Sequence, residues 1–188
     1  MKDFASLQEE FVSSEQVFAG RLLDVRKDTV CLPNGVRKSR ELIRHVGAAC
    51  VAALTEDGRI YLEHQFRYPM NEVLTEAPAG KLDGKEEPPL AAAQRELREE
   101  TGLTAEEWIS LGKYYPTPAY SDEVIYLYLA RSLRSGEQKL DEDEFLNVFT
   151  LPLADAVAAV MAGEIPDGKT QTVILKAAQY LACEQKPE

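Results

Sequence analysis

The segment QRELREETGL, residues 94–103, constrains the fold of this 188-residue chain more than any other segment. At about 100° per residue, a helix here places Glu96, Glu99 and Glu100 within an arc of roughly 100°. Gly102 follows at the position where a glycine in the left-handed conformation commonly ends a helix. The segment therefore predicts a short helix that presents three carboxylates on one side and stops at a glycine cap.

The neighbouring side of the predicted helix is apolar, because Leu90, Ala93 and Leu97 lie on an adjacent arc and can be buried. The grouped acids repel one another and weaken the helix by roughly a few tenths of a kcal/mol per pair. A divalent cation would offset this repulsion. Because the ligands are all oxygen atoms, with no histidine or cysteine nearby, Mg²⁺ is favoured, with Mn²⁺ as its substitute. The alternative interpretation is a solvated acidic helix face.

A loop rich in glycine and proline, residues 79–89, precedes this helix. The loop, the helix and the glycine cap together resemble the Nudix box of the Nudix hydrolases. The family pattern is a Gly, five residues, a Glu, seven residues, then Arg-Glu-aliphatic-x-Glu-Glu-x-Gly-aliphatic. Residues 95–103 match every fixed position of its second part. Counting forward from Gly80 gives Glu86 as the first glutamate, whereas counting back from Arg95 gives Glu87, so both assignments stay open.

Further segments resemble one branch of this family, the ADP-ribose (ADP-sugar) pyrophosphatases, from Phe18 to the C-terminus. They are Arg40-Glu41, His45-Val46-Gly47-Ala48, Gln65-Phe66-Arg67-Tyr68-Pro69, Glu76-Ala77-Pro78-Ala79-Gly80-Lys81, the run from Tyr115 to Glu123, and the acidic run Leu140-Asp141-Glu142-Asp143-Glu144. The resemblance implies Mg²⁺-dependent hydrolysis of the diphosphate bond of ADP-ribose to AMP and ribose 5-phosphate. It leaves as alternatives a GDP-sugar, FAD or a dinucleotide as substrate, and a catalytically inactive ADP-ribose sensor. A sensor is expected to have lost box glutamates, and this chain keeps all three.

The rest of the sequence predicts an α+β fold with a mixed sheet and flanking helices. The expected elements are a helix or loose tail over 1–13, a meander over 17–43 with a turn at Leu32-Pro33-Asn34-Gly35, a central strand over 47–54, a hairpin turn over 56–59, a return strand over 60–67, strands over 108–115 and 124–130, and helices over 153–162 and 169–183. In the last helix, Val173, Leu175, Ala178 and Leu181 are expected to face the core. The Nudix resemblance specifies an α/β/α sandwich with an N-terminal β-meander. We expect residues 1–44 to be a β-rich, dimer-forming segment and residues 45–188 to be the catalytic domain.

Hydrolysis of a diphosphate needs cations to neutralise its non-bridging oxygens and a water positioned for attack. Glu96 and Glu100 are one helical turn apart and can bind the same metal, and Glu99 can hold a second metal. By resemblance, the backbone carbonyl of Ala79 and a carboxylate of the acidic loop, assigned to Glu144, complete the ligands.

Two further roles concern the acidic loop and the arginine of the box. We assign Glu142 as the general base, because the base of the resembled branch tends to come from this loop; a box glutamate, Glu99, is the alternative. The other interpretation of residues 141–144 is a solvated loop. Arg95 is expected to point away from the metals and to pair with Glu86 or Glu87 in a structural role.

The substrate-binding candidates rest mainly on the resemblance. Arg67 could form a forked pair with a diphosphate oxygen, or a surface salt bridge. Arg40 and Glu41 fit contacts to adenine or ribose, supplied by a partner subunit. Glu123 is assigned to the terminal ribose or a metal. Phe18 is a candidate for stacking on the base, with a core aromatic as the alternative.

The composition indicates which partners and which compartment to expect. The net charge of −11 argues against a nucleic acid or a membrane surface as partner. The three cysteines are far apart, without a CxxC pair, and are typical of reduced thiols in a cytoplasmic protein. The polar N-terminus is unlike a signal peptide, and no apolar run approaches the length of a membrane span. We expect a cytoplasmic homodimer that acts on a small nucleoside diphosphate sugar.

Overall fold

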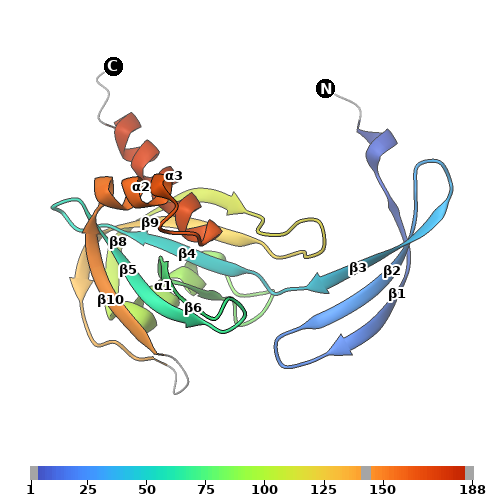
Figure 1. Ribbon diagram of the computed structural model, residues 1–188, viewed down its shortest axis with the longest axis horizontal. Coiled ribbons are helices and arrows are strands. Elements are labelled where there is room, and N and C mark those ends of the chain that lie inside the picture. Colours follow the sequence, from blue (N-terminus) through green and yellow to red (C-terminus); the bar gives the residue numbers. More distant parts are fainter. Residues whose placement is uncertain (1–3, 141–144, 185–188) are drawn as a thin grey trace. The chain divides into compact units, whose positions relative to one another are not determined.

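The structure, a computed structural model, describes residues 4–140 and 145–184 (Figure 1). The chain divides into two compact units. The first comprises the residues up to His45 together with Thr117–Glu123, and the second comprises Val46–Pro116 and the residues from Val124 onward. None of the helices in the described ranges is long and apolar enough to cross a membrane.

The first unit is an antiparallel meander, as predicted. After a 3-10 turn, η1 (Ala5–Leu7), its strands are β1 (Glu10–Ala19), β2 (Asp24–Cys31) and β3 (Arg37–Arg44), in the order β1-β2-β3. The predicted turn is present between β2 and β3, where Gly35 N donates to Leu32 O at 2.8 Å. The expectation of a helix or tail up to residue 13 is wrong for residues 10–13. They begin β1, where Phe11 pairs with Val30 and its β-favouring side chain suits the sheet.

The segment Thr117–Glu123 belongs to this unit because it lies along the end of β3. Ile43 N donates to Tyr120 O at 2.8 Å, and Asp122 N donates to Ile43 O at 3.2 Å. The Asp122 carboxylate also accepts from His45 N at 2.7 Å and from Arg44 Nη1 at 3.1 Å. Residues 117–123 are therefore tied to the N-terminal strands although the sequence between them is long.

The second unit contains a four-stranded mixed sheet, a three-stranded antiparallel sheet and three helices. The mixed sheet has the order β7-β4-β9-β8, in which β4 and β9 are parallel, and the antiparallel sheet has the order β10-β5-β6. The elements are β4 (Ala48–Ala53), β5 (Arg59–Arg67), β6 (Glu72–Glu76), β7 (Ala79–Lys81), α1 (Pro89–Thr101), β8 (Leu103–Tyr114), β9 (Ile125–Ser135), β10 (Leu146–Pro152), α2 (Leu153–Ala162) and α3 (Gly168–Glu184).

Strand β4 is the buried centre of this unit, as predicted. Because side chains alternate along a strand, its two faces belong to different apolar clusters. One face joins a cluster with α2 and α3, which includes Val160, Val173 and Ile174, and the other joins a cluster with α1, which includes Ala93 and Leu97. Figure 1 shows these helices on the two faces of the mixed sheet. The α/β/α sandwich and its mixed sheet are thereby confirmed.

The pairing of the predicted return strand is the main difference from the expected topology. The turn after β4 forms, with an isolated bridge between Leu54, which follows β4, and Ile60 of β5, but β5 then pairs with β10 and β6. Both edges of β4 are occupied, by β7 and β9, so β4 has no free edge for β5 to pair with. Strands β6, β7 and β10 were not anticipated from the sequence.

Two helices bury slightly different faces than expected. In α3, Val173 is buried as predicted, but Leu175 is 38% exposed, and Ile174 and Ala177 are buried in its place. In α1, Leu90 is exposed. The buried residues of α3 are therefore Thr170, Val173, Ile174 and Ala177.

Candidate active site

Helix α1 begins after Pro88 and ends at Gly102, whose φ of 72° is the left-handed cap that the sequence predicted. The Gly102 N–H donates to Arg98 O at 2.9 Å. A Cβ at Gly102 would also lie 2.8 Å from Gln138 N and 2.9 Å from Gly136 O. Glycine is therefore required here both for its backbone conformation and for the close passage of residues 136–138.

The acidic side of α1 lies against strand β7. Glu100 is only 3% exposed, and its Oε2 accepts a hydrogen bond from Ala79 N at 2.9 Å. The Glu96 carboxylate lies so close to Gly80 that a Cβ there would overlap it. The structure thus brings together Ala79, Gly80, Glu96 and Glu100, which the sequence had grouped through the box pattern.

Arg95 contacts three glutamates and a carbonyl. Its Nε lies 3.3 Å from Glu87 Oε1, and its Nη2 donates to Lys81 O at 2.9 Å. The Nη1 group donates to Glu96 Oε1 at 2.7 Å and to Glu99 Oε2 at 3.2 Å. The expectation that Arg95 points away from the metal-binding acids is therefore wrong, because its guanidinium provides the counter-charge that these clustered carboxylates need.

Glu87, and not Glu86, is the loop glutamate that contacts Arg95. Glu86 is exposed and makes no hydrogen bond or ion pair with that arginine. The hydrogen bond from Arg95, together with one from the Asp83 N–H, holds the pKa of Glu87 below its usual value. The inserted residue that left the box count open therefore lies between Gly80 and Glu87.

The carboxylates of α1 are the candidate metal ligands. Within the described ranges, no three acidic, histidine or cysteine side chains are gathered closely enough to enclose an ion. Glu96 and Glu99 contact Arg95, and Glu100 contacts Ala79 N. The donor set nevertheless suits a hard divalent cation, because it consists of carboxylate oxygens beside the backbone of β7, which Glu96 approaches closely at Gly80. Binding through Glu96 and Glu99 requires Arg95 to release them.

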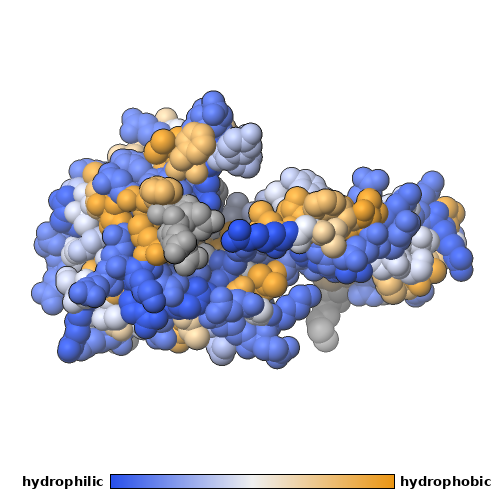
Figure 2. All heavy atoms as spheres, turned by 90° about the horizontal axis from the view of Figure 1, so that it is seen from below, coloured by the Kyte–Doolittle hydropathy of each residue, from blue (hydrophilic) through white to orange (hydrophobic). Residues whose placement is uncertain are grey.

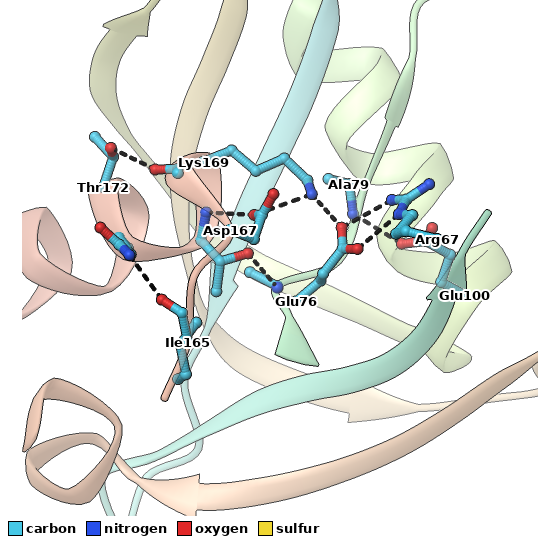
Figure 3. Close-up of polar contacts among 12 residues, drawn as sticks. Arg67, Glu76, Ala79, Glu100, Ile165, Asp167, Lys169 and Thr172 are labelled. Atoms are coloured by element: carbon cyan, nitrogen blue, oxygen red, sulfur yellow. Dashed lines mark hydrogen bonds and ion pairs between the residues drawn. The ribbon is translucent and has the colours of Figure 1, made fainter. Parts of the chain in front are cut away.

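A second charged cluster, centred on Glu76, was not recognised from the sequence (Figure 3). Glu76 ends β6 and is 1% exposed. Its Oε1 accepts from Arg67 Nε at 2.6 Å and its Oε2 accepts from Arg67 Nη2 at 2.8 Å. Lys169 Nζ also binds Glu76 Oε2 and lies 3.1 Å from Asp167 Oδ2. The cluster links β5, β6 and the start of α3.

The charges in this cluster outweigh the effect of burial. Burial alone would raise the pKa of Glu76, but the Arg67 hydrogen bonds and the charge of Lys169 hold that pKa below its usual value. Burial alone would lower the pKa of Lys169, but Asp167 and Glu76 raise it. Glu76, Arg67 and Lys169 are therefore all charged near neutral pH.

Arg67 is held in this cluster by Glu76. Its Nε and Nη2 are both committed to Glu76, so the salt-bridge interpretation describes the side chain as it stands. Among the described residues, none accepts a hydrogen bond from Nη1. That edge of the guanidinium remains available for an anionic ligand.

The other substrate-binding candidates lie in the first unit. Arg40 binds the Glu9 carboxylate through Nε, at 3.0 Å, and through Nη2, and Glu41 is exposed. Glu123 Oε1 lies 3.8 Å from His45 Nδ1. Phe18 is 54% exposed, so the core-aromatic interpretation is wrong for this chain taken alone.

Glu142 and Glu144 lie outside the described residues. The chain that leads to them is anchored at the C-terminal end of α1. The Gln138 side chain donates to Glu100 O, and Lys139 N donates to Glu99 O at 3.0 Å. Beyond the acidic run, Leu146 pairs with Gln65 on β5.

Two family models match the chain. One, described as the NUDIX domain, matches residues 43–170, and the other, described as the nucleoside diphosphate sugar hydrolase N-terminal domain, matches residues 9–43. The chain therefore belongs to the Nudix family, as the resemblance of residues 95–103 predicted.

Individual proteins agree with this membership. The ADP-ribose pyrophosphatase of Bacillus subtilis (strain 168) is 42% identical over 178 residues, which is 94% of each chain. The methanol dehydrogenase activator of Bacillus methanolicus is 39% identical over 180 residues, or 95% of each chain. A crystal structure described as that of an ADP compounds hydrolase is similar with a TM-score of 0.83 at 23% identity, over 97% of this chain and 99% of that chain. This last likeness shows that the fold is the same.

Substitution of Gly80 tests whether the close approach of Glu96 to β7 matters for ion binding. We expect Gly80→Ala to weaken Mn²⁺ binding by about 10-fold, the low end of what perturbed ligand placement costs. Because the overlapping atoms are the mobile end of the Glu96 side chain, we expect only a small change in the thermal unfolding temperature. Electron paramagnetic resonance of free Mn²⁺ during a titration measures the affinity.

Gly84→Ala is the matched control. Gly84 follows β7 closely in the sequence, and a Cβ there would meet no atom within 4 Å. This variant should bind Mn²⁺ as the unmodified protein does. Equal Mn²⁺ affinity for both variants would show that the Glu96 carboxylate beside Gly80 is not part of the ion site.

Proposed function

We propose that this protein hydrolyses the diphosphate bond of ADP-ribose to AMP and ribose 5-phosphate, with Mg²⁺, or Mn²⁺ in its place. The observation that carries the proposal is the position of Glu96 and Glu100 against Ala79 and Gly80. The nature of the substrate is supported by the Bacillus subtilis relative, whose name is ADP-ribose pyrophosphatase, at 42% identity over 94% of both chains. The match of residues 9–43 to a nucleoside diphosphate sugar hydrolase domain supports the same class of substrate.

The residues that would hold Mg²⁺ are Glu96, Glu100 and the backbone carbonyl of Ala79, with Glu99 for a second ion. When bound, Mg²⁺ supplies positive charge that neutralises the non-bridging oxygens of the diphosphate. Before an ion binds, the two Nη1 hydrogen bonds of Arg95 hold Glu96 and Glu99 on the same side of α1, and Arg95 would release them to the ion. The buried Glu100 is fixed by the Ala79 N–H, so its carboxylate has little freedom to turn away from β7.

We assign the general base to Glu142 and a metal-ligand role to Glu144. Glu142 would take a proton from the attacking water as its oxygen bonds to phosphorus and the bridging oxygen leaves. Lys139, three residues before Glu142, donates its backbone N–H to Glu99 O. Three residues can span up to about 11 Å, so the length of the chain allows Glu142 to reach the α1 carboxylates. Glu99, which is partly exposed beside them, is the alternative base.

The substrate contacts that we propose come from side chains of several elements. Arg67 offers Nη1 to the diphosphate while Glu76 holds the rest of its guanidinium in place. Arg40 and Glu41 serve the adenine or ribose, Glu123 the terminal ribose, and the exposed ring of Phe18 the base.

We further propose that the protein is a homodimer in which the first unit forms the interface. Every residue of β1 is exposed. A three-stranded sheet is stable when it buries an apolar face, and exposed apolar patches are typical of interaction sites. Apolar side chains are exposed on this unit (Figure 2), and they include Phe11, Val17, Phe18, Leu22, Leu23 and Val36. In this proposal, Arg40 and Glu41 of one subunit serve the site of the other.

The three cysteines support a cytoplasmic location, which we also propose. Cys31, Cys50 and Cys183 are free thiols. Burial raises the pKa of the Cys50 thiol, so this side chain is an inert part of the core and not a nucleophile.

A panel of diphosphate compounds tests the reaction and its substrate. We expect AMP release with the highest kcat/KM from ADP-ribose, compared with a GDP-sugar, FAD and a dinucleotide, and loss of activity on metal chelation. Glu100→Gln should lower kcat by at least about 10²-fold, because a ligand that stabilises the transition state is removed. A direct test is needed because one relative, at 39% identity, bears the name of a dehydrogenase activator. A higher kcat/KM for another compound would reassign the substrate, and no hydrolysis of any compound would favour a sensor.

The acidic loop offers a test of the base. We expect Glu142→Gln to lower kcat by about 10²–10⁴-fold without changing the Mg²⁺ dependence, since it removes a proton acceptor. Glu144→Gln should instead raise the Mg²⁺ concentration that gives half of the maximal rate. The measurement is a Mg²⁺ titration of kcat for both variants. Normal turnover by Glu142→Gln would move the base to Glu99 or Glu123.

Sedimentation velocity at micromolar concentration tests the dimer. The unmodified protein should sediment as a dimer, and Phe11→Asp should sediment as a monomer, because it places a charge in the apolar interface. Met161→Asp is the control, since Met161 is 74% exposed on α2, which belongs to the second unit. A fully active monomer of the unmodified protein would contradict the proposal.

A further inference from the structure

The segment that joins β6 to β7 determines where Ala79 lies. It runs from Glu76, the last residue of β6, through Ala77 to Pro78, and all three residues are almost completely buried. After this segment, Ala79 N donates to Glu100 Oε2 at 2.9 Å, and Ala79 pairs with Cys50 of β4. Any shift of this segment therefore moves the Ala79 carbonyl relative to the carboxylates of α1.

The first turn of α3 binds this segment at two consecutive residues. Thr170 is 0% exposed, and its Oγ1 accepts a hydrogen bond from Ala77 N at 2.9 Å. Lys169 Nζ binds the Glu76 carboxylate directly before it, as Figure 3 shows. The two contacts hold the backbone and the side chain of adjacent residues.

Asp167 keeps this turn in its required shape. Its Oδ2 accepts from Thr170 N at 2.9 Å, which is the hydrogen bond of a helix N-cap, and lies 3.1 Å from Lys169 Nζ. The opposite side of the segment is held by β4, because Val51 N donates to Pro78 O at 2.9 Å. From Glu76 to Ala79, each residue is thus fixed by a different partner.

From these contacts we infer that Thr170 and Lys169 are positioning residues, which fix the backbone at Glu76–Ala77 so that the Ala79 carbonyl is oriented to bind a divalent cation with Glu96 and Glu100. The inference rests on the proposed metal site and adds to it two residues of α3, far from the Nudix box in the sequence. Because the Thr170 hydroxyl accepts from Ala77 N, two residues before Ala79, its effect on ion binding passes through this segment.

The test compares Mn²⁺ affinity in three threonine variants. Thr170→Val keeps the shape of the side chain but removes the acceptor, so the Ala77 N–H loses its partner; we expect the Mn²⁺ Kd to rise by about 10-fold. Thr170→Ser keeps the hydroxyl and should stay within about 3-fold of the unmodified protein. Thr172→Val is the matched control, because Thr172 Oγ1 donates to Gly168 O within α3 at 2.7 Å and does not touch the segment. Mn²⁺ resonance in a titration gives each Kd without any turnover.

Thermal unfolding without metal distinguishes a positioning role from a purely structural one. An unchanged Mn²⁺ Kd in Thr170→Val, with only a lower unfolding temperature, would overturn the inference. If Thr170→Val does not fold, Lys169→Gln replaces it, since Glu76 keeps its Arg67 partner, and an unchanged Kd in that variant would likewise overturn it. Glu100→Gln separates the two proposals: if it leaves Mn²⁺ binding intact, the proposed metal site fails, whereas loss of binding there with normal binding in Thr170→Val overturns the positioning role alone.

Discussion

The close approach of helix α1 to strand β7 is the constraint on which the candidate active site depends. Only a residue without a side chain at position 80 lets the Glu96 carboxylate reach the strand, and the Ala79 N–H then fixes Glu100. Apolar packing holds the helix in this position, because Leu97 packs against the central strand β4. The same strand pairs with β7. Hydrophobic packing on one side of α1 thus places the acidic groups on the other.

The clustered charges are compensated by a few arginines and a lysine. Arg95 contacts Glu87, Glu96 and Glu99, and this arrangement balances the repulsion that three neighbouring carboxylates create. Arg67 and Lys169 do the same for the buried Glu76. In a protein of net charge −11, these cations offset the local excess of negative charge where an anionic substrate would bind.

The sequence predicted the features whose causes are local. The glycine cap of α1, the turn at Leu32–Gly35 and the bounds of α2 follow from periodicity and turn chemistry, and all are present. Features that depend on distant partners were missed. Strand β5 does not pair along β4, because other strands occupy both edges of β4. The hydrogen bond between Thr170 and Ala77 joins residues that are 93 positions apart in the sequence. The choice between Glu86 and Glu87 likewise needed the Arg95 contacts, since the count along the chain supported both.

The most direct test of the account is a crystal structure of the protein with Mn²⁺, in which anomalous scattering at the manganese edge locates the ions. The account predicts an ion bound by the Glu96 and Glu100 carboxylates and the Ala79 carbonyl oxygen, with Arg95 released from Glu96. An ion bound elsewhere, with Arg95 still paired to Glu96 and Glu99, would contradict the claim that the acidic side of α1 is the metal site.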